Sequence, residues 1–145
     1  MSGFEYASIL VPYNATPGAK RGWSAAIDLA KKTNGQITLI TCIESQSFMS
    51  FFKKNGKDEF ETEKQLVEKE LEKMKHETKK LEKAIKHVIV KTSFAPDTII
   101  EYAEKNKIDI VVIGQTKISP AERKYYQSTA NYLLQGLSCP LLVVK

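Results

Sequence analysis

Short apolar runs alternate with helical patterns along the whole chain, and this alternation limits the possible folds more than any other feature. The runs rich in β-branched and apolar residues cover 8–13, 36–43, 87–94, 108–113 and 141–144. Strands that alternate with helices form parallel sheets joined by right-handed crossovers. A chain of 145 residues also suits one domain with a sizeable core. The sequence therefore predicts a single α/β domain over residues 1–145, built on a doubly wound five-stranded parallel sheet.

The first helix has clear start and stop signals. Thr16 followed by Pro17 suits a helix start, and Asn34 followed by Gly35 suits a left-handed stop. Between them an apolar face repeats at spacings of three and four residues, made of Ala19, Trp23, Ala26, Ile27 and Ala30. We expect Trp23 to pack on the sheet, with stacking on a ligand base as the alternative.

The longest helical pattern runs from 58 to 88, where apolar residues follow a near-heptad spacing and lysines close the segment. Either a coiled coil or packing on the sheet fits this pattern, and packing on the sheet is favoured. Before it, Phe48, Met49, Phe51 and Phe52 interrupt the polar rhythm. These aromatic residues predict a loop folded back on the domain, with a lid or a partner-docking patch as the alternative.

Composition argues against several classes of function. The net charge is +5, but lysines alternate with glutamates between 57 and 86, which makes a mixed solvated face and disfavours nucleic-acid binding. Two separated cysteines, Cys42 and Cys139, and two histidines disfavour a metal site, and both cysteines are expected to be small buried residues. No apolar run reaches the ~18 residues of a membrane span, and the start lacks a secretory signal. A cytoplasmic location is expected.

The stretch from 109 to 145 carries the main functional signal. A strand ends at Gly114, an irregular segment follows, and a helix begins near Ser128. This arrangement presents backbone N–H groups to a phosphate. In doubly wound sheets, ligands bind beyond the carboxyl ends of the strands, where the strand order reverses. Asn14 and Gly114 end the first and fourth strands, so both are expected to face that crevice.

Three segments resemble the universal stress protein family. They are ILVPYNATPGAKRGWSAAIDLAKK (9–32), APDTIIEYAEKNKIDIVVIG (95–114) and SCPLLVV (138–144). The resemblance implies a flavodoxin-like three-layer α/β/α sandwich with strand order 3-2-1-4-5. It also implies a homodimer in which the last strands, from Leu141 to Val144, pair. An unpaired apolar edge strand is an aggregation risk, which gives a separate reason to expect a partner.

Members of that family that bind ATP share a motif of glycine, two residues, glycine, nine residues, then glycine and serine or threonine. In this sequence the spacing is kept from Gly114 to Ser128, but Lys117 and Gln127 replace two of the three glycines. The family's acidic residue after the first strand falls on Asn14. The resemblance thus implies a nucleotide site made of Pro12, Asn14, Gly114, Lys117, Gln127 and Ser128.

Two interpretations of this altered motif compete. In the first, the side chains of Lys117 and Gln127 close the phosphate cradle, so the protein does not hold ATP tightly and acts through dimerisation or a protein partner. In the second, Lys117, Ser128 and Arg123 hold a phosphate, AMP or ATP as a switch. Steric exclusion favours the first for a triphosphate.

Catalytic signatures are missing from the sequence, which contains no GxxxxGK[ST] loop, no GxGxxG after the first strand and no GxSxG elbow. We therefore expect that the protein is not an enzyme, with slow ATP hydrolysis as the second alternative. Residues 119–126 are expected to form a surface loop, with a mobile flap as the alternative.

Overall fold

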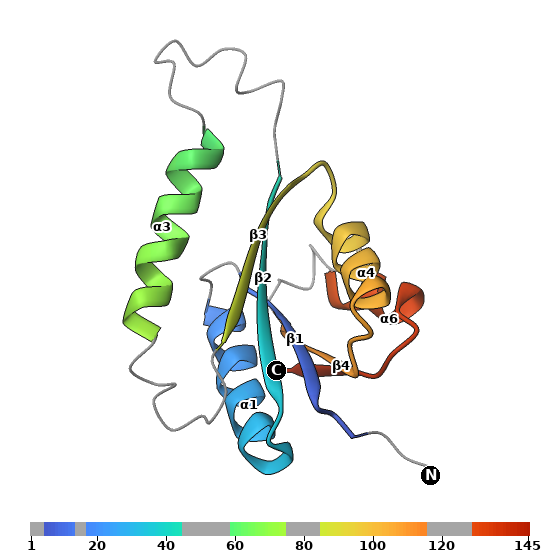
Figure 1. Cartoon of the computed structure of the whole chain (residues 1–145). Coiled ribbons are helices and arrows are strands. Elements are labelled where there is room, and N and C mark those ends of the chain that lie inside the picture. Colours follow the sequence, from blue (N-terminus) through green and yellow to red (C-terminus); the bar gives the residue numbers. More distant parts are fainter. Residues whose placement is uncertain (1–4, 14–16, 45–58, 75–84, 116–128) are drawn as a thin grey trace.

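In the computed structural model, which describes residues 5–13, 17–44, 59–74, 85–115 and 129–145, five parallel strands form one sheet in the order β3-β2-β1-β4-β5 (Figure 1). The strands are β1 (Ser8–Pro12), β2 (Gln36–Glu44), β3 (Lys86–Thr92), β4 (Ile110–Gly114) and β5 (Leu141–Val144). Ser8 of β1 pairs with Gln36 of β2, and Ile9 pairs with Ile110 of β4. The predicted sheet and its order 3-2-1-4-5 are confirmed.

Helices cover both faces of this sheet. The helices α1 (Pro17–Thr33) and α3 (Glu59–Met74) lie on one side, and α4 (Ala95–Lys105) and α6 (Thr129–Gly136) lie on the other (Figure 1). One apolar core fills the layer beneath α1, and a second one, which includes Ile99 of α4 and Leu133 of α6, fills the opposite layer. The molecule is thus the three-layer α/β/α sandwich that the resemblance implies.

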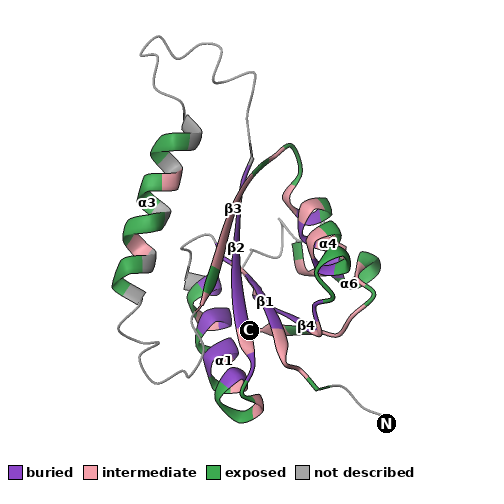
Figure 2. Ribbon diagram, in the orientation of Figure 1, coloured by how far each residue is buried: buried purple, intermediate pink, exposed green. Residues whose placement is uncertain are grey.

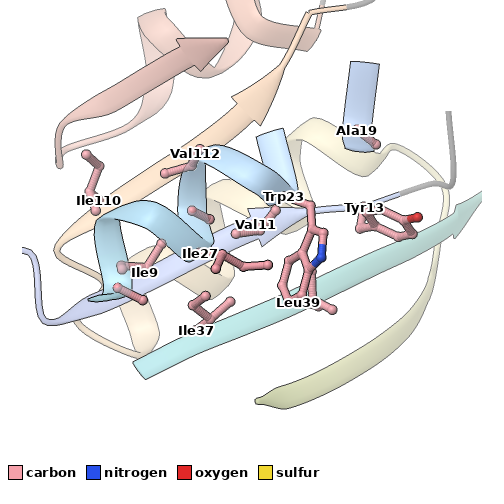
Figure 3. Close-up of a cluster of buried hydrophobic side chains, with 12 residues drawn as sticks. Ile9, Val11, Tyr13, Ala19, Trp23, Ile27, Ile37, Leu39, Ile110 and Val112 are labelled. Atoms are coloured by element: carbon pink, nitrogen blue, oxygen red, sulfur yellow. The ribbon is translucent and has the colours of Figure 1, made fainter. Parts of the chain in front are cut away.

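The apolar face predicted for α1 packs in the first core. All five apolar residues predicted for its inner face are buried, and they pack on the central strands. Figure 3 shows Trp23 beside Leu39 and Tyr13 in this cluster. Trp23 is only 2% exposed, so the packing role is confirmed and no free ring face remains for a ligand base. Asn34, with φ of 54°, ends the helix in the predicted left-handed conformation.

The predicted helix 58–88 and the predicted strand 87–94 overlap at residues 87 and 88; the strand is confirmed there, and the end of the predicted helix is wrong. Val88 lies in β3, where it pairs with Ile40 of β2. Pairing with β2 satisfies the backbone hydrogen-bonding groups of this segment, and its β-branched residues favour a strand. In the described residues the helix is α3, which lies against β2, and most of the α3 residues whose burial is described are exposed (Figure 2). This position agrees with packing on the sheet; the aromatic segment 48–52 lies outside the described residues.

The two cysteines are less buried than predicted. Cys42 and Cys139 are not joined in a disulfide; both are partly buried and pack at the margin of the second core. Burial raises the pKa of the Cys139 thiol, which makes it a poorer nucleophile at neutral pH. Within the described residues, no group of histidine, cysteine and carboxylate side chains is arranged to hold a metal ion. No described helix is long and apolar enough to cross a membrane.

Candidate functional site

The strand order reverses between β1 and β4, which are neighbours in the centre of the sheet. From β1 the sheet continues through β2 to β3, and from β4 it continues to β5. Pro12 is the last residue of β1 and Gly114 is the last residue of β4, so both lie at the carboxyl edge beside this reversal. Of the six predicted site residues, these two are described. Asn14, Lys117, Gln127 and Ser128 lie outside the described residues.

Hydrogen bonds hold the backbone immediately after β1. The N–H of Tyr13 donates to the carbonyl oxygen of Ile40 over 2.9 Å. The hydroxyl of Thr41 donates to the carbonyl oxygen of Tyr13, also over 2.9 Å. Thr41 is buried within an apolar strand, and sequence analysis missed its role. The two threonines of this β-branched run, Thr38 and Thr41, were the available signal, because a buried hydroxyl needs a hydrogen-bond partner.

Gly114 sits directly under the first turns of α1. A Cβ built on Gly114 would overlap the carbonyl group of Gly18, and a Cβ built on Gly22 would lie 2.7 Å from the backbone nitrogen of Gly114. Backbone atoms cannot give way as the end of a flexible side chain can. Glycine at 114 is therefore needed for the packing of α1 on β4, whether or not a ligand binds.

Gln115, the residue after Gly114, forms hydrogen bonds through both its N–H and its carbonyl oxygen. The N–H of Gln115 donates to the carbonyl oxygen of Val144 in β5 over 2.8 Å. The carbonyl oxygen of Gln115 accepts a hydrogen bond of 2.7 Å from Nη2 of Arg21 in α1. Sequence analysis did not identify Arg21 as a site residue. These bonds tie α1 and β5 to the backbone from which the segment 116–128 departs.

The described charged groups near this edge are basic residues of α1. The first turn of α1 contains no acidic residue, so nothing there offsets the partial positive charge of the helix N-terminus. Lys20 is paired with Glu70 of α3, with 3.4 Å between Nζ and Oε1. Arg21 has no carboxylate partner among the described residues. Among the described residues, this arrangement favours an anion over a cation near the N-terminus of α1.

A histidine of β3 lies on the same face of the sheet as Thr41. Nε2 of His87 in β3 is 3.5 Å from the hydroxyl oxygen of Thr41, a long contact. Burial lowers the pKa of His87 below its ordinary value of 6.5, and the nearby carboxylate of Glu68 in α3 opposes that effect. His87 therefore tends to be neutral in the folded protein at physiological pH.

The sequence and the fold are similar to those of one known protein family. A model of the universal stress protein family matches residues 5–145. The chain is 26% identical over 143 residues to a universal stress protein of Methanocaldococcus jannaschii. The aligned region covers 97% of this chain and 82% of that protein.

Solved structures share the fold. A universal stress family protein from Burkholderia pseudomallei superimposes with a TM-score of 0.71 at 19% identity, covering 99% of this chain and 98% of that one. The universal stress protein from Archaeoglobus fulgidus in complex with dAMP superimposes with a TM-score of 0.65 at 15% identity, covering 97% and 98%. The family match spans nearly the whole chain, and the strand order and the layers agree with it: this chain belongs to the universal stress protein family.

Proposed function

We propose that this protein is a cytoplasmic regulatory module of the stress-response type, which works as a homodimer, does not hold ATP tightly and is not a dedicated enzyme. The observation that carries the proposal is the altered motif that follows Gly114. Its spacing to Ser128 is kept, but Lys117 and Gln127 stand where ATP-binding members have glycine. A triphosphate needs close approach to the backbone at these positions, and a side chain in that space opposes it.

The packing of Gly114 supports the same proposal. Because the contact with Gly18 already requires glycine at 114, the presence of this first motif glycine is not by itself a sign of ATP binding. Without Gly114, Ser128 is the remaining motif residue that favours a phosphate-binding site. Lys117 and Gln127 favour a site that is closed to phosphate.

The dimer part of the proposal is supported by β5. This strand forms an edge of the described sheet, and Leu142 within it is 40% exposed. An apolar edge strand pairs readily with another strand, and pairing with the same strand of a second copy is self-complementary. We propose that two protomers join through Leu141–Val144.

Mass spectrometry under native conditions tests the ligand part. The protein as purified should carry no ATP, and its melting temperature should not rise with millimolar ATP and magnesium. Copurified ATP at near one molecule per chain, or a clear rise in melting temperature with ATP, would overturn the proposal, because a ligand bound to the folded state stabilises it.

A second candidate function is a switch that binds a nucleoside monophosphate. The complex of the Archaeoglobus fulgidus protein with dAMP, on a similar fold, favours it. A single phosphate needs less space beside Lys117 and Ser128 than a triphosphate does. In this case AMP, and not ATP, would raise the melting temperature of the protein. Equal lack of effect from both nucleotides would exclude this candidate.

A further inference from the structure

We propose that α3 is an acid-released cover of the sheet, which lies against β2 at neutral pH and leaves it when His87 of β3 takes up a proton. The proposal concerns the side of the sheet where β2 and β3 are neighbours, at the end opposite to β5. It therefore depends neither on a nucleotide nor on the proposed pairing of two protomers through β5.

His87 faces the layer that contains α3. In the parallel register His87 pairs with Leu39 of β2, whose side chain belongs to the core beneath α1. Its Nε2 also lies 3.5 Å from the hydroxyl oxygen of Thr41, two residues along on the same face of β2. The helices α1 and α3 lie on this side of the sheet (Figure 1). His87 is partly buried, and the carboxylate of Glu68 in α3 is near enough to act on it.

The surroundings of His87 suit a neutral imidazole better than a charged one. The hydroxyl of Thr41 donates its hydrogen to the carbonyl oxygen of Tyr13, so its oxygen is left as an acceptor for His87. A protonated imidazole has two N–H donors, and this long contact is the one acceptor that the described residues give it. Burial lowers the pKa of His87, and the charge of Glu68 opposes that effect. Release of α3 gives the ring access to water, so protonation of His87 and docking of α3 oppose each other.

The other charged groups of the described layer do not reverse this effect. Glu68 attracts a charged His87, but Glu68 is exposed, and water screens the attraction. Lys91 lies four residues along β3 on the same face, and its positive charge adds to the cost of charging His87. Lys20 of α1 and Glu70 of α3 are paired with each other. Near pH 6 neither partner of that pair changes its charge.

The attachment of α3 is weak enough for a local release. Of the α3 residues whose burial is described, none is buried, and β3 has no buried residue either (Figure 2). The pair of Lys20 and Glu70 has 60% and 25% exposed side chains, and such a solvent-screened pair contributes little. The described buried residues of both cores come from other elements. An element with little buried surface can open while the core stays folded.

Hydrogen exchange at about pH 7.5 and about pH 5.5 tests the proposal, with rates corrected for the intrinsic effect of pH; carboxylates stay ionised in this window. As pH falls, the released form binds the proton first, because its histidine keeps a pKa near 6.5. The amide protection of α3 should therefore fall severalfold, while the amides of β1 and β4 keep theirs. A loss of the same size in β1 and β4 would show global unfolding and overturn the proposal.

Two histidine variants assign the effect, because the chain has two histidines, His76 and His87. His87→Gln should remove most of the pH dependence of α3 protection. His76→Gln is the matched control and should respond to pH as the wild type does. Glu68→Gln removes the charge that favours a protonated His87, so the loss of α3 protection at low pH should become larger. An unchanged response in His87→Gln would contradict the proposal.

A titration of the wild-type protein by NMR needs no altered residue at the interface. The ring signal of His87 is assigned by comparison with the spectrum of His76→Gln. Its midpoint should lie below pH 6.5, and the loss of α3 protection should follow the same curve. A midpoint at or above 6.5, or α3 protection that does not change across the titration, would overturn the proposal.

Discussion

The carbonyl group of Gly18 in α1 lies against the Cα of Gly114 at the end of β4, with no room for a side chain between them. Gly114→Ala would force a Cβ into backbone atoms, so α1 would have to move off the sheet. We expect a loss of about 3 kcal/mol or more in the free energy of unfolding, at the upper end of overpacking costs. Urea unfolding followed by circular dichroism measures this loss.

The matched control for Gly114 is Gly136 in α6. A Cβ there would lie 2.5 Å from Cδ1 of Ile100, which is the far end of a flexible side chain. Gly136→Ala should therefore cost little, within about 1 kcal/mol of the wild type. Equal losses in the two variants would show that the contact with Gly18 does not limit the packing of α1.

Asp109 joins the starts of two neighbouring strands. Its Oδ2 accepts hydrogen bonds of 2.9 Å from the N–H groups of Ala7 and Ser8, and its own N–H donates to the carbonyl oxygen of Ser8. Asp109→Ala leaves two partly buried donors without their acceptor and should lower the free energy of unfolding by about 2 kcal/mol or more. Asp28→Ala, at an exposed position of α1, should stay within about 0.5 kcal/mol. Chemical denaturation of both variants measures these losses in the free energy of unfolding. A small loss for Asp109→Ala would contradict the role given to its carboxylate.

His87 makes stability depend on pH in a defined direction. Burial lowers its pKa in the folded protein below 6.5, so the unfolded chain takes up a proton first as pH falls. The free energy of unfolding should therefore decrease from about pH 7 through 6.5 toward the lowered pKa, in addition to the effects of other groups. His87→Gln should show a smaller decrease over that window in urea titrations at several pH values. An identical pH profile in the variant would mean that another group causes the decrease.

Leu142 tests the proposed dimer. Leu142→Lys places a charge on the exposed face of β5, which should convert the dimer to a monomer in sedimentation velocity experiments or cause aggregation. Leu66→Lys is the control, because Leu66 in α3 is 61% exposed and lies away from this strand. A dimer that persists in Leu142→Lys would show that the interface is elsewhere, and a wild-type monomer would exclude the dimer altogether.

The sheet could be predicted from sequence because its signals are local. Each strand is a short β-branched run, and α1 has a start at Pro17, an apolar stripe and a stop at Asn34. The segment around Val88 was ambiguous because a helix and a strand compete for a charged apolar run, and only pairing with Ile40 on β2 decides between them. The same dependence on tertiary contacts explains why the half-buried state of Cys139 was missed.

The ends of β1 and β4 could be predicted from sequence, but the contacts around them could not. The end of β4 at Gly114 was placed correctly, since strand order and the carboxyl edge follow from the fold. Arg21 was missed because its partner Gln115 is 94 positions away in sequence. The packing role of Gly114 was missed for a similar reason, as it arises only when Gly18 and Gly22 of α1 meet β4.

Restoring the two lost glycines tests what prevents tight ATP binding. If the side chains of Lys117 and Gln127 exclude the triphosphate, then Lys117→Gly combined with Gln127→Gly should create or strengthen ATP binding, because the backbone N–H groups become approachable. Isothermal titration calorimetry should show at least about a tenfold gain in affinity over the wild type. Lys117→Ala combined with Gln127→Ala removes the same charge and amide but keeps a Cβ at each position, so it should gain less. A double glycine variant that still fails to bind ATP would place the obstruction elsewhere, with the aromatic segment 48–52 as the next segment to change.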